Sequence, residues 1–297
     1  MITSRGPMRN VRLASFLGAS VEVLLYFLLV GLGLLTAGLG YLLVRGPGPT
    51  RLEDLARDPV LWPLQTLGVV GPTVLLMAAR HPDLLRALRQ TRPRRAATGA
   101  ARGMVLGLGA GSLAAGLVVA WPGPGEITPG DAAGFATTLW IQANVALSEE
   151  AIFRGYLWLI LEDRLGHRLT LVLTSLLFAL AHGANPAFTP APPVLLNLLL
   201  AGLVLGTLRR QTGFAAAVGW HFGWNSGLGG LFGLPVSGLT FPALLRVAGA
   251  APAFWAGGPF GPEGGLAGTV ALALSFGLLG GWKGARRTIL KVRRILP

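Results

Sequence analysis

Long apolar runs alternate with short basic segments along the whole chain. A helix that crosses a bilayer needs about 20 mostly apolar residues, and about eight such runs are present. They lie near 17–44, 60–79, 104–121, 133–162, 169–183, 193–208, 213–230 and 265–282. The pattern predicts an all-α fold, a polytopic bundle of about eight transmembrane helices.

Composition supports a membrane protein. Of the 297 residues, 52% are hydrophobic and only 12% are charged, whereas soluble domains carry about twice that charged fraction. A bilayer can cover this much apolar surface, but a single globular core cannot. We therefore predict one membrane domain, 1–297, that crosses a lipid bilayer several times, and we expect it in a bacterial cytoplasmic membrane.

The distribution of basic residues indicates the orientation. If the N-terminus is cytoplasmic and the eight helices alternate, all but five of the 25 Lys and Arg fall in cytoplasmic segments. The exceptions are Arg45, Arg51, Arg57 and Arg246 on the opposite side and Arg154 within the fourth helix. Cytoplasmic loops are enriched in Lys and Arg, so this asymmetry predicts an N-in/C-in topology.

Two function classes are disfavoured. The net charge is +13, but the arginines form short clusters between apolar runs, without the long basic arm typical of a nucleic-acid partner. The chain has no cysteine, which excludes disulfides, thiolate metal sites and a cysteine nucleophile.

The run 133–162 carries charges that are expensive inside a bilayer, about 2.5–3.5 kcal/mol each. Glu150 and Arg154 are four residues apart, so they share a helix face and can pair. Glu149 lies about 100° further round the helix and has no partner at helical spacing. We predict a supporting Glu150–Arg154 pair and a free, reactive Glu149. The alternative is one ion network that only stabilises the bundle.

Three further polar residues lie in later apolar runs. His182 ends the run 169–183, and His221 and Asn225 share a face of the run 213–230. Taken singly, each fits ordinary hydrogen bonding between membrane helices. Together with Glu149 they can form one hydrolytic site.

That site has two open chemical interpretations. A carboxylate and an imidazole can activate a water, while the second imidazole and the amide stabilise an oxyanion. Glu149, His182 and His221 are also a ligand set for catalytic zinc. The cofactor therefore stays open between zinc and a metal-free, glutamate-activated water. No hydroxyl, Ser148 included, has the context of a nucleophile, so we do not expect an acyl-enzyme.

The polar motifs resemble those of the CAAX protease and bacteriocin-processing family, which includes the type II CAAX prenyl endopeptidases. The matching motifs, in order, are Glu149-Glu150-x-x-x-Arg154, Phe178-x-x-x-His182 and His221-x-x-x-Asn225. The resemblance covers helices 4–7, residues 133–230, as a catalytic core. It implies an intramembrane endopeptidase.

The resemblance also implies a role for each motif residue. It makes Glu149 the water-activating carboxylate and His182 its partner. His221 and Asn225 would be oxyanion donors or ligands, and Glu150 and Arg154 supporting residues.

Three functions follow from these observations. The first is an endopeptidase of the CAAX-processing type that acts on membrane-bound protein or peptide substrates. The second is a non-enzymatic bacteriocin-immunity or scaffold protein of the same fold. The third is an ion-coupled transporter, which is disfavoured because the sequence shows no inverted repeat. The convergence of the motifs favours the endopeptidase.

Overall fold

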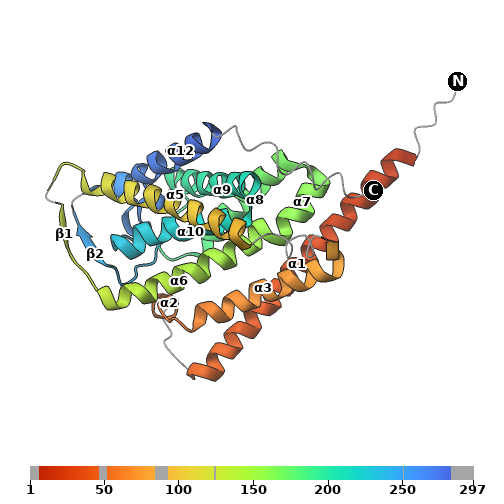
Figure 1. The fold of residues 1–297 in the computed structure, drawn as a ribbon, viewed down its shortest axis with the longest axis horizontal. Helices are drawn as coiled ribbons and strands as arrows, with labels where there is room; N and C mark the ends of the chain where they lie inside the picture. Colours follow the sequence, from red (N-terminus) through yellow and green to blue (C-terminus); the bar gives the residue numbers. More distant parts are fainter. Residues whose placement is uncertain (1–6, 47–51, 84–92, 124, 250, 282–297) are drawn as a thin grey trace.

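The computed structural model describes residues 7–46, 52–83, 93–123, 125–249 and 251–281, and it is mainly helical (Figure 1). The helices are α1 (Pro7–Arg45), α2 (Leu52–Ala56), α3 (Leu61–Arg80), α5 (Pro93–Val119), α6 (Ala132–Glu150), α7 (Leu157–Leu165), α8 (His167–Ala181), α9 (Pro192–Gln211), α10 (Phe214–Asn225), α11 (Ala253–Ala256) and α12 (Leu266–Gly281). Short π or 3₁₀ segments are η1 (Ala151–Tyr156), η2 (His182–Ala184), η3 (Ser226–Leu231), η4 (Gly258–Phe260) and η5 (Pro262–Gly264).

Five described helices are long and apolar enough to cross a membrane. They cover Ser20–Arg45, Leu61–Arg80, Pro93–Val119, His167–Ala184 and Pro192–Gln211, and Leu266–Gly280 is a shorter apolar helix. Their outer faces carry exposed leucines, such as Leu28, Leu35 and Leu43 on α1. Such surfaces are stable in lipid and not in water, so the chain is an integral membrane protein.

Two predicted helices are interrupted in the structure. The run 133–162 consists of α6, the π-helical η1 and then α7, and the run 213–230 consists of α10 and the π-helical η3. Inside η1, Gly155 has non-helical backbone angles (φ −86°, ψ −116°). Two carbonyls of η1 accept hydrogen bonds from other helices: Tyr26 donates to the Ala151 carbonyl at 3.1 Å and Arg209 to the Arg154 carbonyl at 2.9 Å. Such π segments are frequent at functional sites.

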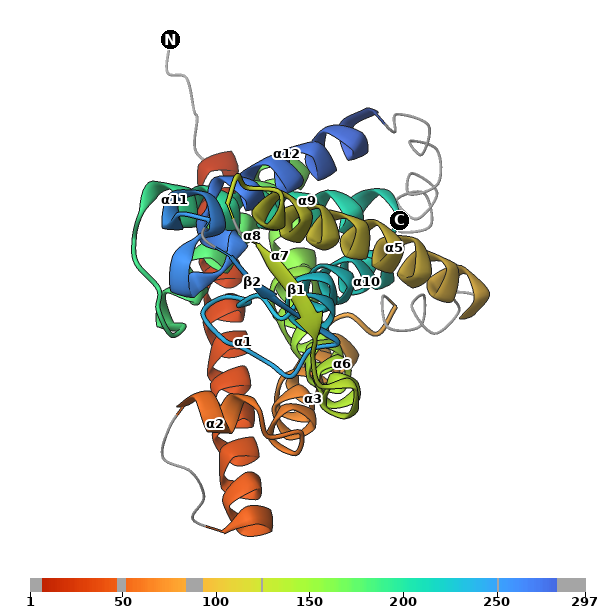
Figure 2. The same cartoon turned by 90° about the vertical axis from the view of Figure 1, so that its left-hand side faces the viewer.

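The all-α prediction also missed a small sheet. Strands β1 (Glu126–Pro129) and β2 (Leu245–Ala248) pair antiparallel, with Glu126 opposite Ala248. They lie at the left end of the molecule in Figure 1 and face the viewer in Figure 2. The stretch from 232 to 244 between η3 and β2, here called the cap segment, packs at the same end.

Glycines let α5 and α10 touch along their backbones. A Cβ on Gly103 would collide with the carbonyl of Ala216, and one on Gly107 with the carbonyl of Trp220. In the reverse direction, a Cβ on Gly223 would collide with α5. Small residues at every fourth position permit such close approach in membranes. This contact fixes the position of α10, which carries two of the polar residues singled out above.

We therefore expect Gly107→Ala to destabilise the protein by about 1–3 kcal/mol, because the added methyl group separates α5 from α10. Gly109→Ala is the matched control, since no atom of the described residues lies within 4 Å of a Cβ there, and better helix propensity should stabilise it by up to about 1 kcal/mol. Thermal unfolding of the detergent-purified variants measures both effects. Equal Tm values for the two variants would contradict this packing.

Candidate active site

Glu149 lies at the C-terminal end of α6, where the chain enters the π-helical η1. Its side chain is 28% exposed and lines a cavity of about 80 Å³. The cavity wall is formed by α3, α6, α8 to α10, the cap segment and η5; its polar members are Gln142, Glu149, His182, Asn185, His221, Asn225, Ser237 and Glu263. The residues predicted to form one site thus share one cavity.

Both predicted histidines face the same oxygen of Glu149. The Nε2 atom of His182 lies 3.9 Å from Glu149 Oε2, and the Nε2 atom of His221 lies 3.8 Å from it. Glu149 Oε2 is buried and has no hydrogen-bond partner among the described residues. The groups that face this oxygen therefore come from η2 and α10 and not from its own helix.

The hydrogen bonds at Nδ1 fix the tautomers of the two rings. His182 Nδ1 lies 2.8 Å from the Phe178 carbonyl oxygen, and His221 Nδ1 lies 3.1 Å from Glu150 Oε1. A carbonyl and a carboxylate oxygen only accept, so Nδ1 carries the proton in each ring. A neutral ring then presents the lone pair of Nε2 to Glu149. The two Nε2 atoms and Glu149 Oε2 thus face one position in the cavity. A water there can donate hydrogen bonds to two of these three acceptors.

The predicted Glu150–Arg154 pair is present and fully buried. Arg154 donates to Glu150 Oε1 at 3.1 Å, and both side chains are 0% exposed. Arg154 also donates to the Gly202 carbonyl at 3.0 Å and lies over the Phe178 ring, 4.6 Å from its centre. Because Glu150 also holds the ring of His221, the pair does more than the helix spacing indicated: it orients a histidine of the site.

Asn225 lies in the cavity wall, bound to a residue that sequence reasoning missed. Its side-chain amide donates to Gln142 Oε1 at 2.9 Å, and both residues are buried. Gln142 precedes Glu149 by seven residues, two helical turns, so both project from one face of α6. A buried amide at that spacing was the available signal. Among the hydrogen bonds of the described residues, Gln142 is the only partner of Asn225 Nδ2, and Asn225 lines the cavity.

Sequence reasoning also missed Glu263, which lies between the predicted helices 213–230 and 265–282. Its carboxylate is buried and takes three hydrogen bonds. Trp224 Nε1 donates to one oxygen at 2.9 Å. The second carboxylate oxygen of Glu263 accepts two hydrogen bonds from Ser237, one from its backbone N–H and one from its hydroxyl, both at 2.6 Å. Glu263 therefore fastens the cap segment to α10 beside Asn225. No periodic pattern surrounds it in the sequence, so nothing there indicated burial.

The geometry does not fit the predicted zinc alternative. Two ligands of a tetrahedral zinc with bonds of about 2.1 Å lie about 3.4 Å apart. The corresponding separations from Glu149 are 3.8 and 3.9 Å. Across the described parts of the chain, no three or more His, Cys, Asp or Glu side chains are arranged to hold a metal ion. A water about 2.8 Å from two of these acceptors spans the observed separations with an angle of about 85–90° at its oxygen.

A comparison with protein families independently selects the same region. Residues 132–227 match the family model described as "Type II CAAX prenyl endopeptidase Rce1-like". The match runs from the start of α6 into η3 and includes all six predicted site residues. No curated protein and no solved structure matches the chain significantly. The resemblance inferred from the motifs is thus confirmed: residues 132–227 are similar to the Rce1-like, type II CAAX prenyl endopeptidase family, which is a family of proteases.

Proposed function

We propose that the protein is an intramembrane endopeptidase that hydrolyses peptide bonds of membrane-associated proteins or peptides with a water activated by Glu149. One observation carries the proposal. Glu149 Oε2 faces the Nε2 atoms of His182 and His221 in a cavity among apolar helices. Uncompensated polar groups are costly there, so their convergence favours catalysis over packing.

The first step is attack by water. A water between Glu149 Oε2 and His182 Nε2 donates one hydrogen bond to each, which turns its lone pairs towards the cavity. Glu149 removes the first proton as the water oxygen bonds to the scissile carbonyl carbon. The Nδ1–H bond from His182 to the Phe178 carbonyl keeps the ring in the tautomer that this step requires.

The second step is collapse of the tetrahedral intermediate. We assign stabilisation of its oxyanion to the second N–H of Asn225, whose amide is oriented by Gln142. As the C–N bond breaks, the proton held by Glu149 passes to the leaving amine. His221, oriented by Glu150, faces the same carboxylate and keeps it aligned between the two steps.

We also propose the predicted membrane arrangement, about eight spans with both termini in the cytoplasm of a bacterium. The support is the excess of Lys and Arg in alternate connections.

The test compares protein termini in cells that express the chain with those in cells that express Glu149→Ala/His182→Ala. New termini from membrane proteins are expected only with the unchanged chain. An immunity or scaffold protein would instead retain its cellular effect in the double variant, and a transporter would show proton-coupled uptake in liposomes. Identical termini in both cell lines, with both chains present in the membrane, would contradict the proposal.

Hydrolysis by the purified protein should persist in excess strong chelator, because no three or more His, Cys, Asp or Glu side chains of the described residues are arranged to hold a metal ion. Product formation from a peptide identified in the termini experiment is the measurement, with and without chelator. Loss of activity on chelation, and its return with added zinc, would restore the metal alternative.

Glu263→Gln is expected to raise KM about tenfold and to change kcat by less than about threefold. A glutamine can present only one accepting oxygen to the donors of Trp224 and Ser237, so the cap wall of the cavity loosens while Glu149 stays in place. Glu162→Gln is the matched control, because Glu162 accepts a similar hydrogen bond from Trp158, at 2.8 Å, outside the cavity wall. A fall in kcat with unchanged KM would argue against this positioning role.

A further inference from the structure

We propose that the cavity of Glu149 opens at the arginine-poor end of the bundle, so that cleavage occurs on the extracytoplasmic side of the membrane. The substrates would be membrane-anchored peptides whose scissile bond lies in a translocated segment. This inference rests on the proposed peptidase function and adds the side of the membrane on which the enzyme acts.

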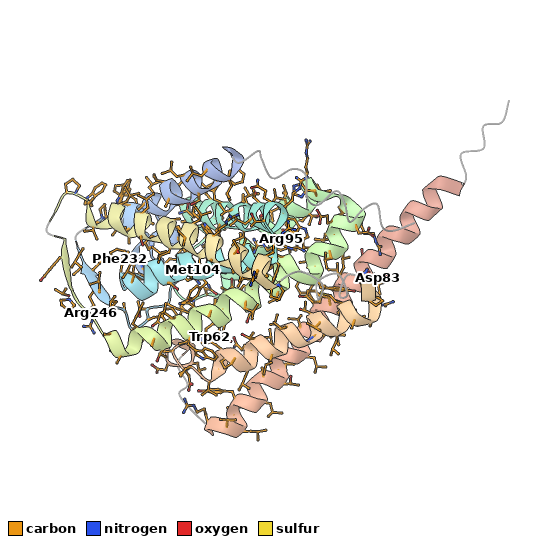
Figure 3. All side chains as sticks on the ribbon, in the orientation of Figure 1. Trp62, Asp83, Arg95, Met104, Phe232 and Arg246 are labelled. Carbon is orange, nitrogen blue, oxygen red and sulfur yellow. The ribbon has the colours of Figure 1, made fainter. Side chains whose placement is uncertain are left out.

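Contacts around the small sheet define one end of the bundle. There β1 pairs with β2, Arg57 donates to the Thr240 carbonyl at 2.8 Å, and Trp255 donates to the Leu117 carbonyl at the end of α5 at 2.9 Å. Figure 2 looks onto this end, and Figure 3 labels Arg246 and Phe232 there. We call it the sheet end.

The opposite end is defined by α1, α3, α7, α9 and α12. Glu22 of α1 lies 3.4 Å from His81, just beyond α3, and 3.5 Å from Arg164 of α7. Gln211, at the end of α9, donates to the Leu279 carbonyl near the end of α12 at 3.3 Å. Asp83 is labelled on this side, at the right of Figure 3.

Arginines separate the two ends. Among the described residues at helix ends and in the connections, the opposite end carries Arg80, Arg94, Arg95, Arg164, Arg168, Arg209 and Arg210, and the sheet end carries Arg45, Arg57 and Arg246. Cytoplasmic connections are enriched in basic residues. The opposite end is therefore cytoplasmic and the sheet end extracytoplasmic.

Several residues that line the catalytic cavity lie in connections at the sheet end. His182 is the first residue after α8, and Asn185 in the connection that follows also lines the cavity. The cap segment contributes Val236, Leu239 and Phe241 to its wall. These are residues of connections at the extracytoplasmic end, so the path to Glu149 starts there.

Towards the cytoplasmic end the cavity is closed. One turn beyond Glu150 in that direction lies Arg154, and both side chains are fully buried. Phe178 packs on Arg154 and against Phe153, with ring centres 5.4 Å apart. A peptide reaching Glu149 from the cytoplasm would have to displace this buried ion pair and its aromatic neighbours.

Cysteine accessibility tests this inference, because the chain has no cysteine of its own. Glu126→Cys reports the sheet end, Asp163→Cys the opposite end, and Asn185→Cys and Leu239→Cys the cavity wall. Intact cells expressing each variant are treated with a membrane-impermeant maleimide before or after permeabilisation. The two acidic residues are matched and both are exposed.

We expect Glu126→Cys and at least one cavity variant to be labelled in intact cells, and Asp163→Cys only after permeabilisation. Labelling of Asp163→Cys but not Glu126→Cys in intact cells would overturn the orientation. If both cavity variants react only after permeabilisation, or not at all, while Glu126→Cys reacts in intact cells, the proposed opening is wrong. Labelling does not depend on catalysis, so these failures are distinct from failure of the termini experiment.

Discussion

Glu149→Gln is expected to lower kcat/KM for peptide hydrolysis by about 10²–10⁴-fold, the usual contribution of a positioned general base. The amide has the same shape but cannot take the proton of the attacking water. Its NH₂ group can donate to His182 or His221 Nε2, so the fold should survive. Purified variants are assayed in liposomes with a peptide identified from cells.

Glu126→Gln is the control for loss of a carboxylate, because Glu126 is exposed in β1, away from the cavity. It should retain full activity. Adding His182→Ala to Glu149→Gln should cost little more than Glu149→Gln alone, because the two residues act on one water. Full activity of Glu149→Gln would refute its role as the base.

Arg154→Met is expected to destabilise the protein by about 3–5 kcal/mol, which is the usual cost of leaving a buried charge without its partner. Glu150 would keep its negative charge in a fully buried position. The loss would also free the Gly202 carbonyl from its donor. Unfolding in detergent, followed as Tm and as the yield of monodisperse protein, measures the effect.

Two comparisons isolate the buried charge. Arg154→Met/Glu150→Gln should recover part of the lost stability, because it removes the uncompensated charge. Arg45→Met breaks an ion pair with Asp58 in which Arg45 is 44% exposed, and such pairs contribute about 1 kcal/mol or less. A similar Tm loss for Arg154→Met and Arg45→Met would contradict a special role for the buried pair.

Within single helices, the sequence alone determined most of what the structure contains. Four-residue spacing predicted the Glu150–Arg154 pair, and hydrophobic runs predicted the five described helices that are long and apolar enough to cross a membrane. The absence of a helical partner for Glu149 indicated that its neighbours come from elsewhere. These features follow from the local geometry of the helix, in which a spacing in sequence is a fixed distance in space.

Only the tertiary structure decided which groups meet across helices. It brought Glu150 to the ring of His221, Gln142 to Asn225, and Glu263 to the cap segment. The two π segments and the β1–β2 pair were likewise invisible in the apolar pattern. Each of these depends on the crossing of helices or on irregular chain, where spacing in sequence sets no distance. The polar residues could thus be selected from the sequence, whereas the direction of each hydrogen bond required the packed bundle.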